Sequence, residues 1–368
     1  MRLLRSLWSL AMTNGAGMTD NIMTKALVLL SGGLDSMLAA RVLMEQGVEV
    51  TGLSFKSNFF SADRAKKAAG ELGIKLIEID FSDEHLKMVK NPAHGYGKNM
   101  NPCVDCHGLM LKKAKEIMEK EKFDFVATGE VLGQRPMSQN KEALKIVEKI
   151  AGLEGKLVRP LSAKLLNISE PEKQGKLIRG KLLDISGRSR QRQLELVKKY
   201  GIKEYASPGG GCLLTDPEFS EKLLKILGYW PDCASNDIAL LKYGRAFWLK
   251  DTSPQPSPYK GEGEKNILLV IGRDEKDNEN LEKLAQKGDV IIQLADENGP
   301  TSLLRGIQYN VSSIMEREIQ VLEELKMSEL KLGDSKSQEE IIKLATMLTG
   351  YYATKSRGKK LKLNIINK

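Results

Sequence analysis

Six consecutive residues near the start of the chain have the composition of a phosphate-binding loop. They are Ser31, Gly32, Gly33, Leu34, Asp35 and Ser36. Two glycines let the backbone come close to an anion, and their consecutive N–H groups can surround it. The serine hydroxyls are further donors, and Asp35 is placed either to cap a following helix or to face a phosphate-bound Mg²⁺. The stretch lacks the lysine of a Walker A loop, which argues against ordinary transfer of a γ-phosphate.

Three of the four cysteines have a spacing that suits thiol or metal chemistry. Cys103 and Cys106 form a C-x-x-C pair, and Cys212 follows three glycines, 209–211. In a reducing compartment such a pair binds a metal or takes part in catalysis more often than it forms a structural disulfide. Because the pair begins a predicted helix, the helix dipole stabilises its thiolates. We therefore expect these thiols to act as nucleophiles or metal ligands.

Strands and helices are predicted to alternate around the loop. The apolar run 25–30 predicts a strand that stops at the Ser-Gly-Gly turn, and helical spacing begins after it. Three further strands are predicted at 48–54, 75–80 and 125–128. This alternation indicates an α/β fold with a doubly wound parallel sheet, in which ligands bind at the carboxyl ends of the strands. The nucleotide is therefore expected next to Leu30.

The stretch 31–36 resembles the PP-loop of the ATP pyrophosphatase family, whose members cleave ATP between the α and β phosphates to adenylate a substrate. Residues 101–106, 125–129 and 159–161 look like stretches of the tRNA thiouridine synthases, and the resemblance extends over roughly 25–215. It implies an adenine nucleotide alpha hydrolase-like fold that binds ATP with Mg²⁺. The ATP-binding residues would be Ser31, Gly32, Gly33, Asp35, Ser36, Ser54 and Gly129.

The chain departs from this family at two positions. In the 2-thiouridylases the matching stretch reads Asn-Pro-Asp-x-x-Cys, in which the cysteine holds sulfur and the aspartate aids proton transfer. Cys106 matches the cysteine, but Cys103 occupies the aspartate position, so the proton-transfer role does not carry over and Asp105 is only a candidate substitute. The family's histidine after Ala-Thr-Gly is replaced by Glu130.

The cysteine pattern is compatible with several functions. Related thiolation enzymes bind a [4Fe–4S] cluster through a C-x-x-C and one distant cysteine, an arrangement that Cys103, Cys106 and Cys212 match. A persulfide relay would instead use Cys106 as the sulfur carrier and Cys212 as the resolving thiol. Structural zinc would need His107 or Cys233 as a fourth ligand. The C-x-x-C-H pattern also fits haem attachment, which requires export of the protein.

Length and composition set the remaining expectations. A chain of 368 residues should hold two or more domains. The formal net charge of +9 favours a polyanionic partner, with nucleic acid the leading candidate. With few cysteines and no long apolar run, we expect a cytoplasmic protein without a membrane span. Residues 1–22 are interpreted as a disordered or artefactual extension, 23–230 as the PP-loop domain and 231–368 as a smaller C-terminal α+β domain.

The C-terminal domain carries a low-complexity segment and a basic tail. The proline-rich segment 252–264 is predicted to be an insertion in a hairpin loop, because 245–249 and 266–271 on either side have the pattern of paired strands. The tail 355–362 has five positive charges and no acid, which attracts a phosphate backbone and makes binding sensitive to salt. This part of the chain resembles the small RNA-binding domain of NFACT-type proteins.

Other cationic residues and histidines carry weaker signals. Arg188, Arg190 and Arg192 stand at alternate positions before a helix, as a solvated helix start would, but they are also candidate phosphate contacts. His85 and His94 have no partner at ligand spacing and are expected at the surface.

Together these features predict an ATP-dependent tRNA thiouridine synthase, with Cys106, Cys212 and Asp35 as its catalytic residues. Its partners would be tRNA and a sulfur donor, either sulfide or a protein that carries a persulfide. A PP-loop ligase acting on a small molecule is an alternative, although it leaves the basic tail unexplained. A non-catalytic RNA-binding protein with a degenerate nucleotide fold is another.

Overall fold

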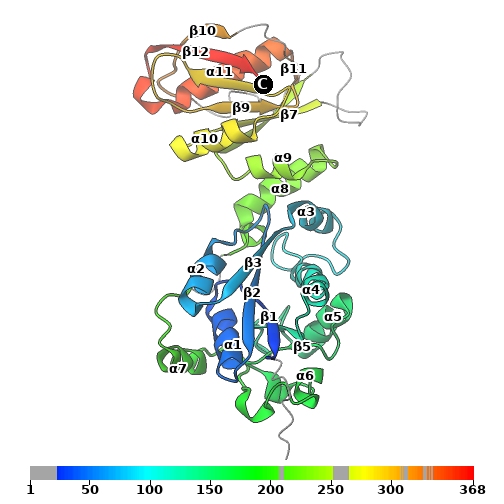
Figure 1. Ribbon diagram of the computed structural model, residues 1–368. Helices are drawn as coiled ribbons and strands as arrows, with labels where there is room; N and C mark the ends of the chain where they lie inside the picture. The colour runs from blue at the N-terminus through cyan, green and yellow to red at the C-terminus, as the bar shows by residue number, and fades with distance from the viewer. Residues whose placement is uncertain are drawn as a thin grey trace, which may run out of the picture. The chain divides into compact units, whose positions relative to one another are not determined.

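The computed structural model describes residues 23–206, 211–251, 265–307, 309, 314–325, 330, 332 and 335–368. They form two compact units, each with its own sheet (Figure 1). The first unit contains the described residues within 1–55, 62–79 and 104–209, and the second contains those within 56–61, 80–103 and 210–368. The predicted extension 1–22, the predicted insertion 252–264 and the glycines at 209 and 210 lie outside the described residues.

The sheet of the first unit has the strand order β3-β2-β1-β4-β5. Its strands are β1 (Lys25–Leu29), β2 (Glu49–Lys56), β3 (Lys75–Asp80), β4 (Phe125–Thr128) and β5 (Leu157–Val158). β1 pairs in parallel with β2 and β4, and β4 pairs in parallel with β5. After β3 the chain crosses to the other side of β1, so the strand order reverses between β1 and β4. The predicted doubly wound α/β fold is confirmed, and its ligand-binding crevice is expected at this reversal.

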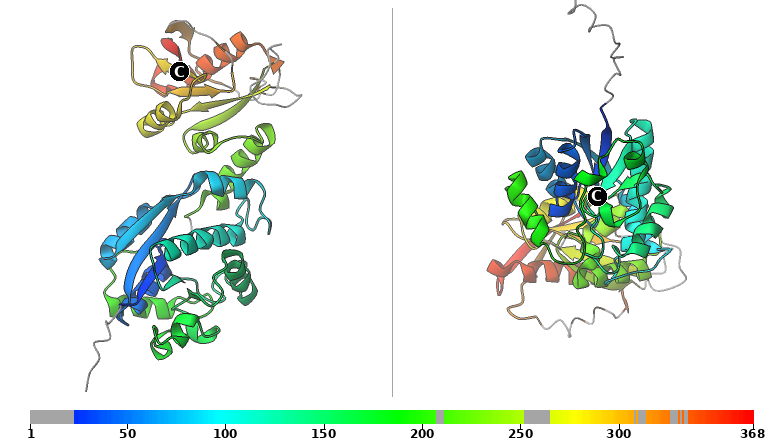
Figure 2. Two further views of the ribbon diagram at one scale, coloured as in Figure 1. Left: turned by 45° about the vertical axis from the view of Figure 1, so that its right-hand side comes forward. Right: turned by 90° about the horizontal axis from the view of Figure 1, so that it is seen from below.

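Helices cover both faces of this sheet (Figures 1 and 2). On one face lie α1 (Leu34–Met44), α2 (Asp63–Leu72) and α7 (Gln191–Tyr200), and on the other α4 (Cys103–Lys120) and α5 (Lys141–Ala151). The short helix α6 (Glu170–Lys173) follows β5. Eight of the eleven residues of α1 are buried, as expected of a helix that is apolar on most sides. The helix that follows the phosphate loop is therefore the best anchored of the unit.

The second unit contains a seven-stranded sheet of order β10-β12-β8-β9-β7-β6-β11. The strands are β6 (Arg245–Asp251), β7 (Lys265–Ile271), β8 (Val290–Leu294), β9 (Ser302–Arg305), β10 (Met315–Gln320), β11 (Ser335–Lys336) and β12 (Lys360–Asn367). All neighbours pair antiparallel except β11 with β6. β6 and β7 pair from Arg245 with Ile271 to Asp251 with Lys265. This confirms that the strands on either side of 252–264 are partners.

Two hydrophobic cores lie on the two faces of this second sheet. The helices of the unit are α3 (Ser82–Lys90), α8 (Pro217–Tyr229), α9 (Ser235–Leu240), α10 (Glu275–Leu284) and α11 (Gln338–Tyr352). Ile267, Leu269 and Ile271 of β7 pack with residues of α11. Leu268 and Val270 belong instead to a core with α8, α9 and α10. The alternation of strand side chains thus places a buried layer on each face.

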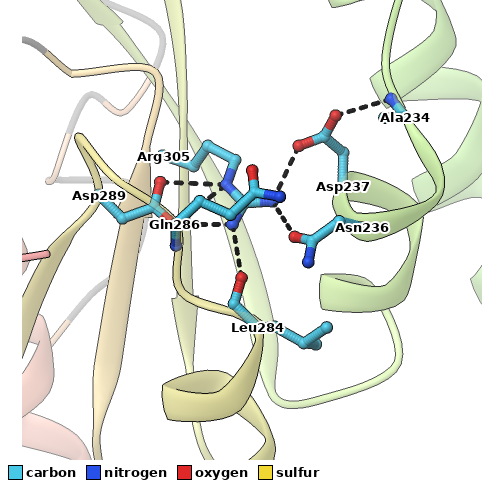
Figure 3. A network of polar contacts seen from close by, with 7 residues as sticks. All are labelled: Ala234, Asn236, Asp237, Leu284, Gln286, Asp289 and Arg305. Carbon is cyan, nitrogen blue, oxygen red and sulfur yellow. Dashed lines mark hydrogen bonds and ion pairs between the residues drawn. The ribbon is translucent and has the colours of Figure 1, made fainter.

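A buried ion network joins β9 to neighbouring segments of the second unit (Figure 3). The guanidinium of Arg305, 2% exposed, pairs with Asp289 at 2.7 Å and with Asp237 at 2.8 Å. It also donates hydrogen bonds to Asn236 Oδ1 at 2.6 Å and to the carbonyl oxygen of Leu284 at 2.9 Å. One guanidinium therefore pairs with two buried carboxylates and links α9 to the turn before β8.

Replacing this arginine should destabilise the second unit strongly. Arg305→Leu leaves Asp289 and Asp237 buried without a counter-charge, so the free energy of unfolding should fall by about 3–5 kcal/mol. As a control, Arg317→Leu removes an arginine whose partner Glu339 is largely exposed, and should cost at most about 1 kcal/mol. Urea unfolding of both variants measures the difference, and equal losses would show that the buried network adds nothing.

His85 is fully buried, so its expected surface position is wrong, whereas His94 is exposed as expected. The imidazole stacks on Phe81, with the ring centres 4.7 Å apart, and meets Phe59 and Phe60 at 5.2 and 5.4 Å. Neither ring nitrogen has a hydrogen-bond partner among the described residues. The physical reason is helical spacing, because His85 lies one turn after buried Phe81 and one turn before buried Val89.

Stability should fall in acid because of His85. Burial lowers the pKa of its imidazole to about 4, whereas the unfolded chain titrates at the ordinary value of about 6.5. Between these values the unfolded chain binds the proton and the native state does not, so stability present above pH ~6.5 is lost toward pH ~4 at up to about 1.4 kcal/mol per pH unit. The denaturant midpoint of His85→Phe, measured against pH, should not show this loss of stability in acid. The midpoint of His94→Gln should show the same loss as wild type. Identical pH profiles for wild type and His85→Phe would contradict the prediction.

Candidate active site

The phosphate loop connects β1 to α1 and is held by its own hydroxyls. Ser36 Oγ donates to the carbonyl oxygen of Gly33 at 2.8 Å, and the two serine oxygens, Ser31 Oγ and Ser36 Oγ, are 3.3 Å apart. Gly33 is the N-cap of α1 and makes no side-chain capping hydrogen bond, while its own N–H donates to Ser31 Oγ at 3.3 Å. Asp35 lies in the first turn and is not the N-cap, so the N–H groups of that turn can bind an anion.

Gly32 and Gly129 are positions where only glycine fits. Gly32 has a φ of +74°, and a Cβ there would lie 2.3 Å from the backbone carbon of Arg64. A Cβ on Gly129, which directly follows β4, would lie 2.5 Å from backbone atoms of Asp35 and Ser36. The end of β4 is thus packed against the first turn of α1, at the reversal of strand order where the fold binds ligands.

Three side chains that lie far apart in sequence meet at Asp35. Gln134 Nε2 donates to its carboxylate at 2.9 Å, and Gln193 Nε2 and an Arg190 nitrogen both lie 3.5 Å from it. Arg190 is thus one of the predicted arginines that does reach the loop, whereas Arg192 pairs with Asp184. Neither glutamine could be identified as a site residue from the sequence. The only local signal was the position of Gln134 just after the strand next to β1.

The two glutamines leave acceptors free at the site. The amide oxygens of Gln134 and Gln193 are buried and have no hydrogen-bond partner among the described residues. A buried acceptor without a partner costs free energy, about 1–3 kcal/mol, until a donor reaches it. Their positions beside Asp35 make them candidates to accept hydrogen bonds from a bound molecule. Ser54, predicted to lie near the adenine, is buried at the carboxyl end of β2.

The C-x-x-C pair occupies the start of α4, as predicted. Cys103 is the first residue of the helix and is half-buried, while Cys106 is buried at 8% exposure. Cys212 is half-buried in the second unit, to which Cys103 also belongs. Burial, and then the nearby Cys103, raise the pKa of the Cys212 thiol to about 11. Cys212 is therefore protonated at neutral pH and needs a base before it can attack.

The metal hypotheses receive no geometric support from the described residues. Within the described ranges, no group of three or more histidine, cysteine or acidic side chains is placed to hold a metal ion. Cys233 is buried in a hydrophobic core with Trp230 and Leu240. His107, the other candidate zinc ligand, contacts Glu130 instead. The cluster and zinc hypotheses therefore stay predictions.

A buried carboxylate at the end of β4 fixes the start of α4. Glu130 accepts a hydrogen bond from Arg159 Nε at 2.9 Å and from Thr128 Oγ1 at 3.0 Å, and its other oxygen lies 3.2 Å from His107 Nδ1. Arg159 is 3% exposed and also pairs with Glu148 of α5. Burial alone would raise the pKa of Glu130, but the charges of Arg159 and His107 outweigh it and hold that pKa at about 2.

Glu130 stands where the thiouridine synthases that this chain resembles have a histidine, and the network shows what this glutamate contacts instead. An ionised Glu130, one residue after Gly129, holds His107, one residue after Cys106. The strand end that packs on the phosphate loop is thereby tied to the helix turn that carries Cys106. The sequence alone showed that Glu130 was unusual, but its partners lie up to 29 residues away along the chain.

Comparison with known proteins agrees with these features. Residues 22–165 match the family model described as "Thiamine biosynthesis protein (ThiI)". A tRNA-specific 2-thiouridylase of Sulfurimonas denitrificans is 40% identical over 119 residues, which cover 28% of this chain and 34% of the relative. A probable tRNA sulfurtransferase of Caldanaerobacter subterraneus is 34% identical over 147 residues, 37% of this chain and 36% of the relative. The chain thus spans about a third of the length of these relatives.

Solved structures give more distant likenesses. A 4-thiouridine synthetase in complex with RNA and ATP is 19% identical with a TM-score of 0.36, covering 60% of this chain and 52% of that one. A predicted tRNA methyltransferase subunit of Methanocaldococcus jannaschii is 16% identical with a TM-score of 0.32, covering 48% of this chain and 76% of that one. These scores are too low to bear on the chemistry of the site. Within the described part of the chain, no helix has the length and apolarity needed to cross a membrane.

The family match, both curated relatives and the loop geometry agree on one assignment for the first unit. The matched segment contains the phosphate loop, the C-x-x-C pair and the end of β4. Residues 22–165, which contain the phosphate loop, are thus similar to the ThiI family model and to stretches of a tRNA-specific 2-thiouridylase and a probable tRNA sulfurtransferase.

Proposed function

We propose that the protein is an ATP-dependent tRNA thiouridine synthase. The observation that carries the proposal is the contact of Gly129 with the phosphate loop, next to Glu130 and its link to the helix of Cys106. The end of β4 would then contact both the loop that binds the nucleotide and the helix α4 that carries the thiol. The tRNA-modifying relatives support the choice of substrate. The sulfur donor would be sulfide or a protein that carries a persulfide, and the reaction would take place in the cytoplasm.

In the proposed first step, the loop residues 31–36 hold the pyrophosphate end of ATP and its Mg²⁺. Asp35, which contacts Gln134 and Arg190, would turn toward the metal–phosphate group. A uridine carbonyl oxygen attacks the α-phosphorus, the bond to the bridging oxygen breaks and pyrophosphate leaves. Adenylation is needed because sulfur cannot expel an oxide ion from a carbonyl carbon. Positioning and charge neutralisation would supply most of the rate acceleration.

In the proposed second step, the thiolate of Cys106 attacks the outer sulfur of a protein persulfide, the donor's thiolate leaves, and Cys106 carries the persulfide. Sulfide would be the donor only for an iron–sulfur carrier, because it cannot form a persulfide without an oxidant. The terminal sulfur of the Cys106 persulfide attacks the adenylated carbon, and AMP leaves with the former carbonyl oxygen. The deprotonated Cys212 then attacks the sulfur of Cys106, so that the sulfur–sulfur bond breaks toward the nucleoside and a Cys106–Cys212 disulfide forms. A thiol reductant restores both thiols. The raised pKa of the Cys212 thiol predicts that its attack on the sulfur of Cys106 slows as the pH falls.

An iron–sulfur cluster on Cys103, Cys106 and Cys212 is the alternative sulfur carrier. Anaerobic purification, with iron and sulfide quantified for wild type and Cys212→Ala, separates the two. The relay predicts an iron-free, colourless protein that still thiolates tRNA. Iron and sulfide that are present in wild type and lost in Cys212→Ala would favour the cluster.

We further propose that the domain 231–368 binds RNA and that the PP-loop domain spans 23–230. The high proportion of cations in 355–362 and the resemblance to NFACT-type domains support the first assignment. Wild type and a variant in which Lys355, Arg357 and Lys359 are replaced by glutamine, which leaves β12 in place, are compared for tRNA binding at increasing salt. Weaker binding and a shallower salt dependence in the variant are expected. Unchanged binding would instead favour an enzyme acting on a small molecule.

Release of pyrophosphate tests the ATP chemistry directly. Wild type should release pyrophosphate from ATP when unmodified tRNA is present, and Asp35→Ala should not. Asp184→Ala is a matched control, because Asp184 is also a carboxylate paired with an arginine of the same segment, Arg192, but does not contact the loop. No release by wild type with any tRNA would favour the non-catalytic RNA-binding alternative.

A further inference from the structure

Aromatic and cationic side chains form a stack where α11 ends in the second unit. Arg357 lies over the ring of Tyr351, with its guanidinium carbon 4.4 Å from the ring centre. Arg245, the first residue of β6, lies over Tyr352 at the same distance. The two tyrosine rings meet edge to face at 5.5 Å. These four side chains make one continuous group, called here the Arg–Tyr stack.

The Arg–Tyr stack carries the positive charges of two arginines. Both of its arginines are exposed, and neither forms an ion pair within the part of the chain that the structure describes. Lys355, two residues before Arg357, is exposed as well. The sequence from Ala345 to Lys368 contains no aspartate or glutamate. The hydroxyls of Tyr351 and Tyr352 also lack hydrogen-bond partners among the described residues, so they remain available as donors.

Two other basic residues of the same domain form ion pairs with acids. Lys360 of β12 lies 3.1 Å from Glu318 of β10, and the same glutamate is the cross-strand partner of Lys362. Arg317 pairs with Glu339, which also accepts the hydroxyl of Tyr309 at 2.9 Å. Arg357 and Lys355 of the basic tail thus differ from Lys360, since neither has an acidic partner among the described residues.

Guanidinium planes and tyrosine rings offer flat faces on which nucleobases stack, while the cations attract phosphates. Such faces are useful only to bases that are not already stacked inside a duplex. We propose that the Arg–Tyr stack binds an unpaired stretch of RNA, with bases against Tyr351 and Arg357 and phosphates near Lys355 and Arg245. This inference rests on the proposed function, and it assigns RNA binding to one surface and to single strands.

The test compares fluorescence anisotropy of the full-length protein with a labelled single strand of about 12 nucleotides and with the same strand in a duplex. The single strand should bind more tightly. Tyr351→Leu, which keeps apolar volume but not the ring, should weaken that binding by about tenfold, whereas Tyr351→Phe should not. Arg357→Lys keeps the charge but removes the flat guanidinium, so it should also weaken single-strand binding.

Arg317→Lys is the matched control, because it makes the same change at an arginine already paired with a carboxylate, and its binding should equal that of wild type. Thermal unfolding confirms that each variant is folded. Single-strand binding by Tyr351→Leu equal to wild type, or an equal loss of duplex and single-strand affinity, would overturn the proposal. Pyrophosphate release by the wild-type preparation tests the proposed function separately, since it does not depend on which surface holds the RNA.

Discussion

Gly32→Ala should abolish pyrophosphate release from ATP. The new methyl group would lie 2.3 Å from the backbone of Arg64, and the φ of +74° is itself unfavourable for alanine. Backbone atoms cannot rotate away as a side chain can, so the loop must move out of its anion-binding conformation. A displacement of about 1 Å at a reacting phosphate costs on the order of a hundredfold in rate, and we expect a loss at least as large. A coupled assay for pyrophosphate measures it.

Gly47→Ala is the control for this substitution. Gly47 also has a positive φ, +80°, but nothing lies within 4 Å of a Cβ at that position. Gly47→Ala therefore introduces backbone strain without a clash. It should lose a little stability and release pyrophosphate at the wild-type rate. Equal rates for wild type and Gly32→Ala would show that the loop does not hold the phosphates.

Cys106→Ser should separate the two half-reactions. Serine fills the buried site of Cys106 but cannot carry a persulfide, so transfer of sulfur to tRNA should fall by at least about a thousandfold. Release of pyrophosphate should persist, because the phosphate loop is unchanged. Both are measured on one sample, by nucleoside analysis of the tRNA and by the pyrophosphate assay.

The control for Cys106 is Cys233→Ala, since Cys233 is also a buried cysteine but packs in a hydrophobic core. It should keep both half-reactions. Thiolation by Cys106→Ser at the wild-type rate would remove Cys106 from the sulfur-transfer step, and simultaneous loss of both half-reactions would point to a role in nucleotide binding.

Features set by neighbouring residues could be predicted from the sequence. The loop 31–36, the strand before it and the helix at Cys103 each depend on a short run of residues whose apolar spacing and turn residues point to the same element. The pairing of the strands around 252–264 was predictable for the same reason. The C-terminal sheet could be predicted only in part, because its order depends on pairings between strands far apart in the sequence.

Features set by distant contacts could not be predicted. Gln193 has no local signal, and only the fold brings it to Asp35, 158 residues away. His85 was misplaced because a polar residue type on a short helix hides its position between Phe81 and Val89. Glu130 was recognised as unusual, but its role depends on Arg159 and Glu148, which meet it only in the folded sheet.

The central claim is that one protein both activates uridine with ATP and delivers sulfur to it. The most direct measurement combines purified wild type with ATP, Mg²⁺, unmodified tRNA and a sulfur donor, and analyses the digested tRNA by mass spectrometry alongside the pyrophosphate released. The account predicts a thiolated uridine that forms only with ATP, in proportion to the pyrophosphate. Pyrophosphate release without any thiolated nucleoside, or thiolation without ATP, would contradict it.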